Sequence, residues 1–311
     1  MSHHLLPVLL KATRPRTYPL AIAGIIVANA LAYSKIGSFT AHNWQVFGLS
    51  LWVALGLQIL SNLANDYGDG VKGTDDHRTD RQTAQGNLNH RTLKAIIISW
   101  AIFIFGCGVG LLYLSFDNIL EILIFLAFGI IAIIAAIAYT MGKRPYGYHA
   151  KGELAVFIFF GLLNVLGGLY LQTQFIRVSD AIMSVVVGLL CTCVLMINNM
   201  RDIDTDQHSQ KNTLAVHFGK DKISQYYRFI LLTAYFLIAT FAVLRQNFYL
   251  LSVCVMAYPV SRHLKVVRQY SDELIIPNQL APQLKAIVII TLVTCLLIAI
   301  NIVLFNRNKI I

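Results

Sequence analysis

The sequence predicts an all-α membrane protein: one domain over residues 1–311, a bundle of nine transmembrane helices around a central cavity. Two observations lead to this fold class. The chain is 57% hydrophobic and only 13% charged, with a mean hydropathy of +0.63, whereas soluble domains carry about 25% charged residues. In addition, nine stretches reach the length of about 20 mostly apolar residues that a membrane helix needs. This composition excludes a soluble globular enzyme, a disordered chain and a secreted disulfide scaffold.

The nine predicted spans follow one another along the whole chain. In order, they are 17–34, 44–64, 93–114, 119–140, 153–172, 180–200, 223–244, 247–266 and 284–305. The first span follows several basic residues and contains Ala30-Leu31-Ala32, which resembles the cleavage site of a secretory signal. Because its apolar run is longer than the core of a signal peptide, we interpret it as a spanning helix.

The lysines and arginines predict the orientation of the bundle. With the N-terminus in the cytoplasm, nineteen of them fall on the inner side, and the outer side holds only Lys35, Arg177, Arg245, Arg307 and Lys309. Cytoplasmic loops of membrane proteins carry such an excess, so we expect a cytoplasmic N-terminus and an outer C-terminus. The net charge of +10 is small for a nucleic-acid-binding protein and reflects this topology, so we expect no nucleic-acid partner.

The acidic residues gather in two inner loops, near 66–92 and 201–222. Nine of the fifteen lie there: Asp66, Asp69, Asp75, Asp76, Asp80, Asp202, Asp204, Asp206 and Asp221. The clusters follow the second and the sixth predicted helix, which end on the same side of the membrane. Residues spaced three to four apart share a helix face, and this spacing selects Asn62, Asn65, Asp66 and Asp69 in one cluster and Asn198, Asp202 and Asp206 in the other. We expect the two faces to meet across a central cavity.

This pattern predicts a magnesium and diphosphate site. Carboxylates that lie close together repel each other unless a cation neutralises them, and oxygen ligands favour Mg²⁺, completed by substrate phosphates and water. The predicted metal ligands are Asp66, Asp69, Asp202 and Asp206. Basic residues for the phosphate oxygens are Arg201 and Lys211, with Lys72, Lys143 and Arg144 on neighbouring inner loops.

A structural interpretation of single acidic residues competes with this one. Asp and Asn at helix ends are often caps or solvated loop residues, and we favour that interpretation for Asp76, Asp80 and Asp221. Asp204 lies off the helical face and fits either interpretation. The charge of Glu153 at the start of the fifth span is also explained by its favourable position at a helix N-terminus.

At these residues the sequence resembles the UbiA superfamily of intramembrane aromatic prenyltransferases, whose two Asp-rich motifs follow the second and sixth of nine helices. It is most similar to the branch that prenylates 1,4-dihydroxy-2-naphthoate in menaquinone synthesis. The motifs that carry this resemblance span nearly the whole chain: Arg14-Pro15-Arg16-Thr17, Asn65-Asp66-Tyr67-Gly68-Asp69, Lys72-Gly73-Thr74-Asp75, Pro145-Tyr146-Gly147-Tyr148, Gly152-Glu153-Leu154, Asn198-Asn199, Arg201-Asp202 and Thr213-Leu214-Ala215-Val216.

Two positions depart from the patterns of the superfamily. Gly73 takes the place of the last Asp in the first motif, and Asp75 follows two residues later. This spacing is typical of the naphthoate branch and disfavours the hydroxybenzoate branch. Asn212 stands where the naphthoate branch often has an arginine, so one possible basic contact is missing.

The resemblance implies transfer of a polyprenyl group from polyprenyl diphosphate to dihydroxynaphthoate, with loss of the ring carboxylate, to give demethylmenaquinone. It implies one Mg²⁺ on Asp66 and Asp69 with Asn62 and Asn65, and another on Asp202 and Asp206 with Asn198. Arg201 and Lys211 would bind the diphosphate. Tyr139, Tyr146 and Tyr148 would stabilise an allylic cation through their rings, or belong to an interfacial aromatic belt. Arg14 or Arg144 would hold the carboxylate of the acceptor.

The resemblance also implies a place in the bacterial cytoplasmic membrane, with the site facing the cytoplasm and the isoprenoid groove open to membrane lipid. Two alternatives remain from the sequence. One is a related prenyltransferase with another acceptor, such as 4-hydroxybenzoate. The other is a secondary transporter, although transporters place their sites near the bilayer midplane, whereas these acids lie at the cytoplasmic edge. The prenyl chain length, the number of metal ions and the oligomeric state stay open.

Overall fold

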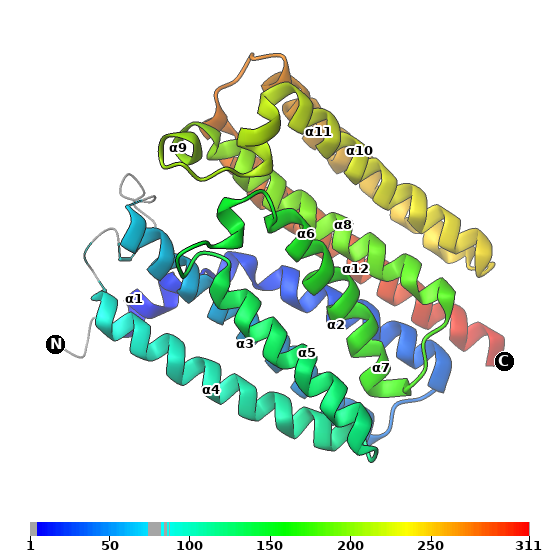
Figure 1. The fold of residues 1–311 in the computed structure, drawn as a ribbon. Coiled ribbons are helices and arrows are strands. Elements are labelled where there is room, and N and C mark those ends of the chain that lie inside the picture. Colours follow the sequence, from blue (N-terminus) through cyan, green and yellow to red (C-terminus); the bar gives the residue numbers. More distant parts are fainter. Residues whose placement is uncertain (1–4, 74–81, 84–85, 87, 311) are drawn as a thin grey trace.

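Nine helical segments that are long and apolar enough to cross a membrane lie within the described part of the chain, as the sequence predicts. They run side by side along the molecule in a computed structural model that describes residues 5–73, 82–83, 86 and 88–310 (Figure 1). The segments are Leu6–Ile36, Ala41–Lys72, His90–Ser115, Ile119–Ala138, Gly152–Thr173, Val178–Arg201, Leu214–Leu244, Phe248–Ser271 and Pro277–Asn306. The bundle therefore has the dimensions of an integral membrane protein.

Most spans are formed by one long α-helix, and one of these helices is kinked at Gly219, where the backbone is non-helical with φ 75° and ψ 170°. These helices are α2 (Tyr18–Ile36), α3 (Ala41–Lys72), α4 (His90–Ser115), α5 (Ile119–Ala138), α8 (Val178–Arg201), α10 (Leu214–Leu244) and α12 (Ala281–Ile310). Short helices precede or connect them: α1 (Leu5–Ala12), η1 (Pro15–Thr17), η2 (Tyr146–Tyr148), α9 (Ile203–His208) and η5 (Pro277–Leu280).

Two spans change their helical geometry part of the way across. The fifth begins as α6 (Gly152–Val156), widens into the π-helix η3 (Phe157–Gly167) and ends as α7 (Gly168–Thr173). The eighth begins as the 3₁₀-helix η4 (Phe248–Met256) and continues as α11 (Ala257–Ser271). Hydropathy predicts both spans but does not distinguish these geometries, because all three helix types satisfy their backbone hydrogen bonds internally.

The α8 helix lies at the centre of the bundle and is the most buried of the nine spans. It packs against α10, η3 and α12. The contact with η3 is close because two glycines meet there: a Cβ atom on Gly161 would lie 2.6 Å from Gly188 Cα and 2.7 Å from the Ser184 carbonyl oxygen. Small residues of this kind let membrane helices approach at backbone distance, so α8 is held in place along its length.

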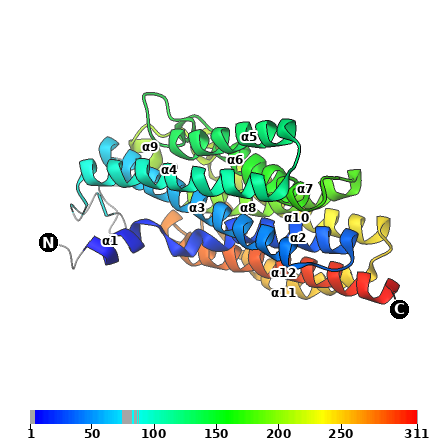
Figure 2. The same cartoon turned by 90° about the horizontal axis from the view of Figure 1, so that it is seen from below.

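The outer helices present apolar side chains to their surroundings. Figure 2 shows α4 and α5 along one edge of the bundle and α11 and α12 along the other. Exposed residues on these edges include Ile102 on α4 and Ile131 on α5. An apolar surface of this extent is stable in lipid and not in water.

The α3 helix continues eight residues beyond the predicted span and ends near the first acidic motif. It starts at a capping box, in which the Asn43 backbone N–H donates to Thr40 Oγ1 and the Thr40 backbone N–H donates to Asn43 Oδ1 at 3.0 Å. It ends at Gly73, whose φ of 70° is left-handed, as is common after a helix. Asp66 and Asp69 therefore lie in the last turns of a helix and not in a loop.

A candidate active site at one end of the bundle

A cavity of about 710 Å³ runs through the bundle and is polar at one end. Its apolar walls come from α3, α4, α5, η3 and α12, with aromatic side chains such as Phe125, Phe128 and Phe159. Its polar residues include Arg14, Arg16, Asn62, Asn65, Asp69, Tyr139, Tyr146, Asn198, Asn199, Arg201, Lys211 and Lys285. Most of the predicted substrate-binding residues thus line one chamber.

The two aspartates of the first motif face different neighbours. Asp69 lines the cavity, is 2% exposed and accepts a hydrogen bond from the Tyr148 hydroxyl at 2.8 Å. Asp66 is also buried, but its Oδ1 accepts from the Thr83 hydroxyl at 3.0 Å and its Oδ2 from the Gln82 backbone N–H at 3.3 Å. Asp66 therefore ties α3 to residues 82–83. Asp75, the last acidic residue of the motif, and Asp76 and Asp80 lie outside the described residues.

The asparagines of the first motif are tied to neighbouring segments as well as to the cavity. Asn62 Nδ2 donates to the Thr13 carbonyl oxygen at 2.7 Å and to Thr17 Oγ1 at 2.9 Å, which fixes α3 against the segment that precedes α2. Asn65 Oδ1 accepts from the Thr140 hydroxyl at 3.2 Å. Their amide groups therefore position α3 in the wall of the cavity.

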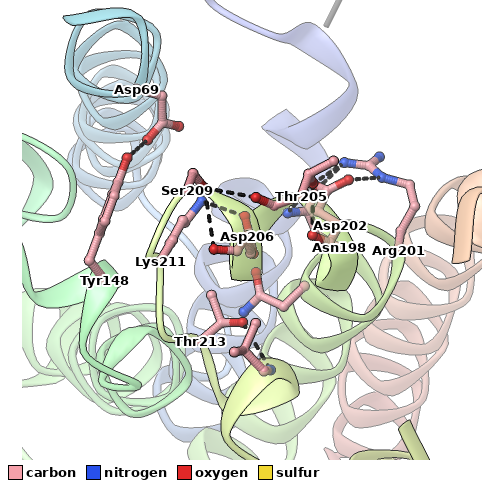
Figure 3. A network of polar contacts seen from close by, with 12 residues as sticks. Asp69, Tyr148, Asn198, Arg201, Asp202, Thr205, Asp206, Ser209, Lys211 and Thr213 are labelled. Atoms are coloured by element: carbon pink, nitrogen blue, oxygen red, sulfur yellow. Dashed lines mark hydrogen bonds and ion pairs between the residues drawn. The ribbon is translucent and has the colours of Figure 1, made fainter. Parts of the chain in front are cut away.

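The second motif departs from the continuous helical face that its spacing predicts. The α8 helix ends at Arg201, Asp202 forms a turn, and α9 begins at Ile203. The reason is local: Arg201 Nε and Nη2 donate to Asp202 Oδ1 and Oδ2 at 2.7 and 2.6 Å, and Nη2 also donates to Asn198 Oδ1 at 3.0 Å. This three-residue contact (Figure 3) holds the guanidinium at the mouth of the cavity, which Arg201 lines.

Asp206 on α9 is buried beside Lys211. Its Oδ1 lies 3.6 Å from Lys211 Nζ, while its buried Oδ2 has no hydrogen-bond partner among the described residues. Burial raises the pKa of Asp206 to about 7; the Lys211 ammonium opposes this effect, and the carboxylates of Asp202 and Asp69 add to it. Asp69 of the first motif and Asn198, Arg201 and Lys211 of the second line the same cavity, so the two motifs converge on one region.

Tyr148 links the two motifs. Its hydroxyl binds Asp69 of the first motif, and its backbone carbonyl oxygen accepts from the Asn212 N–H at 3.2 Å, next to Lys211. Two ammonium groups lie over its ring: Lys72 Nζ is 4.2 Å and Lys211 Nζ 5.4 Å from the ring centroid. The ring therefore gathers positive charge beside Asp69, and Figure 3 shows Tyr148, Lys211 and the acidic residues around one space. Its linking role comes from partners far apart in sequence, so no local signal identifies it.

Tyr139 and Tyr146 form an aromatic pair in the cavity wall, with ring centroids 5.4 Å apart in an edge-to-face arrangement. Burial raises the pKa of Tyr146 to about 12, and its hydroxyl donates to the Ala135 carbonyl oxygen at 2.8 Å. Burial, together with the charge of Glu153, also raises the pKa of the Tyr139 hydroxyl well above its usual range. Both phenols therefore stay neutral at physiological pH.

Several residues in or beside the cavity wall have roles that the sequence does not indicate. Glu153, explained from the sequence by its helix-terminal position, is 5% exposed and accepts a hydrogen bond from Asn199 Nδ2 at 2.8 Å. Arg16 and Lys285 line the cavity from segments at opposite ends of the chain. In contrast, Lys143 and Arg144 are exposed and are not among the residues that line the cavity.

The donor set fits a magnesium ion only when other ligands complete it. Among the described residues, no three carboxylate, imidazole or thiol side chains lie together as a ready-made metal site. The carboxylates of Asp69, Asp202 and Asp206 nevertheless have the ligand chemistry of Mg²⁺, which commonly takes one or two protein carboxylates plus phosphate oxygens and water. The unpartnered Oδ2 of Asp206 is an atom of the kind that such an ion would bind.

Comparison with curated proteins places these features in a family. The model of the UbiA prenyltransferase family matches residues 19–281. The 1,4-dihydroxy-2-naphthoate octaprenyltransferase of Haemophilus influenzae is 35% identical over 294 residues, which cover 94% of each chain. The enzyme with the same name from Escherichia coli is 39% identical over 238 residues, covering 75% of each chain.

Two solved structures share the fold. A digeranylgeranylglyceryl phosphate synthase has a TM-score of 0.60 at 17% identity, covering 96% of this chain and 98% of its own. A UbiA homologue from Archaeoglobus fulgidus has a TM-score of 0.58 at 13% identity, covering 95% and 99%. The family match over most of the chain, the relatives above 30% identity and the shared fold lead to one conclusion: this chain belongs to the UbiA prenyltransferase family.

Proposed function

We propose that this prenyltransferase transfers a polyprenyl group from a polyprenyl diphosphate to 1,4-dihydroxy-2-naphthoate, a step of menaquinone biosynthesis. The observation that carries the proposal is the cavity of about 710 Å³ that joins a long apolar groove to a polar end with Asp69, Arg201 and Lys211. The names of the relatives at 35–39% identity support the acceptor. A transporter is not favoured, because these charged residues lie at one end of α3 and α8 and not at mid-depth.

The diphosphate of the donor would bind at the polar end of the cavity. Lys72 and Lys211, over the ring of Tyr148, and the guanidinium of Arg201 supply positive charge for the phosphate oxygens. Asp69, Asp202 and Asp206, with Asp66 behind them, would hold Mg²⁺, which supplies charge neutralisation for the departing diphosphate. Cleavage of the allylic C–O bond leaves the electron pair on the diphosphate, and these basic residues stabilise that charge.

The isoprenoid would lie in the apolar part of the cavity, which excludes water from the allylic cation. Tyr139 and Tyr146 line the cavity with their ring centroids 5.4 Å apart, and their ring faces would stabilise the cation. The cation then forms a bond with the ring carbon that carries the carboxylate. The carboxylate leaves as CO₂, and its bonding electrons restore the aromatic ring. Arg14, at the polar end of the cavity, would hold the carboxylate until then.

A comparison of acceptors tests the function. Purified protein is supplied with one prenyl diphosphate, Mg²⁺ and either dihydroxynaphthoate or 4-hydroxybenzoate, and products are identified by mass spectrometry. We expect a prenylated, decarboxylated product from dihydroxynaphthoate alone. Asp69→Asn should abolish it, whereas Asp221→Asn, which changes an exposed carboxylate on α10, should retain it. Product from hydroxybenzoate alone would contradict the acceptor, and full activity of Asp69→Asn would contradict the site.

A further inference from the structure

A second cavity, of about 430 Å³, lies at the other end of the bundle. It is formed where α2, α10 and α12 end and α8 begins, on the right of Figure 1. The 24 residues of α8 separate its two ends by about 36 Å. The cavity therefore lies on the membrane face opposite to the aspartates, at the depth of the lipid headgroups.

The polar wall of this cavity is basic. Its polar lining residues are Ser34, Arg177, Arg245, Gln246, Asn247 and Asn306, and none of the described lining residues is acidic. Within the described chain, no carboxylate forms an ion pair with Arg177 or Arg245. By contrast, the nearby ammonium of Lys35 is neutralised by Asp180 at 2.6 Å. The outer side of the bundle carries only five basic residues, and two of them, Arg177 and Arg245, line this one cavity.

The cavity also contains a buried acceptor. Asn247 is 2% exposed, and its Nδ2 donates to the Asn301 carbonyl oxygen at 3.3 Å, which assigns Oδ1 as the acceptor. This Oδ1 is buried and has no hydrogen-bond partner among the described residues. A buried acceptor without a partner is costly, and a ligand hydroxyl would satisfy it.

The rest of the cavity wall is apolar and continuous with the lipid-facing surface. Leu31, Phe241 and Ile302 form its floor. Leu244 at its rim is 62% exposed, and Phe248, which begins η4 after the connecting turn, is 61% exposed. A ligand with an acyl chain can therefore extend from the cavity along the surface of the bundle.

We propose that this cavity binds the headgroup of an anionic, hydroxyl-bearing phospholipid, such as phosphatidylglycerol, with its phosphate between Arg177 and Arg245 and a headgroup hydroxyl on Asn247 Oδ1. Guanidinium groups bind phosphate oxygens through paired N–H donors. The apolar floor favours a lipid over a free anion. The site is separate from the prenyl-transfer cavity, which shares no lining residue with it.

Lipid binding to the purified full-length protein tests the proposal, with native mass spectrometry as the readout. The probes are phosphatidylglycerol, phosphatidylcholine and inorganic phosphate. We expect one phosphatidylglycerol to bind in preference to phosphatidylcholine. The double variant Arg177→Gln/Arg245→Gln should bind phosphatidylglycerol about thirtyfold more weakly, because each basic residue near an anionic lipid strengthens binding about fivefold. Arg177→Lys/Arg245→Lys, which keeps both charges, should recover part of this binding.

Two further variants separate the parts of the proposal. Arg268→Gln, an exposed arginine at the aspartate end of the bundle, should not change lipid binding. Asn247→Ala should weaken binding of phosphatidylglycerol but not of phosphatidic acid, whose headgroup lacks the glycerol hydroxyls. Equal binding of phosphatidylglycerol and phosphatidylcholine, or unchanged binding by the double Gln variant, would overturn the proposal. Inorganic phosphate that binds alone and displaces the lipid at equal concentration would overturn the lipid as the ligand.

Discussion

At the scale of single residues, Tyr148 combines two interactions that usually occur at separate positions. Its hydroxyl orients the carboxylate of Asp69, while its ring face lies beneath the ammonium groups of Lys72 and Lys211. Carboxylate and ammonium groups are thereby held next to each other around one ring. One side chain therefore prepares a place for an anion and for the cation that accompanies it.

The two interactions of Tyr148 can be separated by substitution. Tyr148→Phe keeps the ring and removes the hydroxyl, so we expect the KM for the prenyl diphosphate to rise about tenfold, the usual effect of losing a hydrogen bond to a charged group. Tyr148→Leu removes the ring as well and should cost several-fold more. Steady-state kinetics measures both, with Tyr226→Phe at an exposed position as the control. Equal effects of Phe and Leu would show that the ring contributes nothing.

The raised pKa of Asp206 predicts how stability depends on pH. In the unfolded chain this carboxyl has a pKa of about 4, whereas burial raises it to about 7 in the folded protein. The folded state therefore binds more protons between these values, and the stability of the metal-free protein should fall as pH rises from 4 to 7. Thermal unfolding in EDTA measures this loss, and Asp206→Asn should reduce it.

Added Mg²⁺ should act in the opposite sense, because a proton and a metal ion compete for the same carboxylate. We expect Mg²⁺ to raise the unfolding temperature more at pH 8 than at pH 6. A pH-independent effect of Mg²⁺, or the same effect in Asp206→Asn, would show that the ion does not bind at Asp206.

At the scale of elements, the sequence predicts the nine spans and the positions of the two acidic motifs. It does not predict the π-helical geometry of η3 or the break after α8. Hydropathy and residue spacing depend only on neighbouring positions in the chain. The sequence alone therefore predicts such features. The break at Asp202 depends on side-chain contacts with Arg201 and Asn198 that compete with the helix.

The sequence does not predict the contacts that assemble the site. Glu153 and Asn199 pair across 46 positions, and Tyr148 and Asp69 across 79. Such pairs depend on how helices pack, and no spacing rule along one chain reports them. The same reason explains why Lys285, at the start of α12, was not recognised as part of the cavity wall.

The α4 helix predicts a control over the length of the prenyl chain. Gly108 lines the cavity about 27 Å along α4 from its start at His90, and the space beside it is open. Gly108→Leu should fill this space, so we expect turnover of a long donor to fall tenfold or more while a short donor is retained. Competition between C15 and C40 diphosphates measures the ratio.

The matched control is Gly106→Leu on the same helix. Gly106 also has open space beside it, but it is exposed and does not line the cavity. An equal loss with both variants would indicate damage to α4 and not a block in the groove.

At the scale of the whole molecule, the orientation in the membrane decides which compartment supplies the substrates. We propose a cytoplasmic aspartate end, because nineteen basic residues fall on that side against five on the other. The part of α10 that follows its kink at Gly219 runs from Lys220 to Leu244 and is about 37 Å long. It provides a test because its ends lie on opposite faces.

Single cysteines placed just after the kink of α10 and just beyond its C-terminal end should differ in accessibility. With a membrane-impermeant maleimide on intact cells, we expect Gln246→Cys to be labelled and Lys222→Cys to be protected until the membrane is opened. Both positions are exposed in the structure. The parent chain is the blank, because its five cysteines all lie within the spans. Labelling of Lys222→Cys alone would show that the aspartate end faces the outside of the cell.

The polar end lies at one extremity of a long apolar channel, and this position has a consequence for product release. The diphosphate is released where water begins, whereas the prenylated naphthalenediol is already at the level of the acyl chains when it forms. The diphosphate can therefore depart into solution and the prenylated product sideways into the bilayer. Neither has to pass the other, and the hydrophobic one never needs a carrier through water.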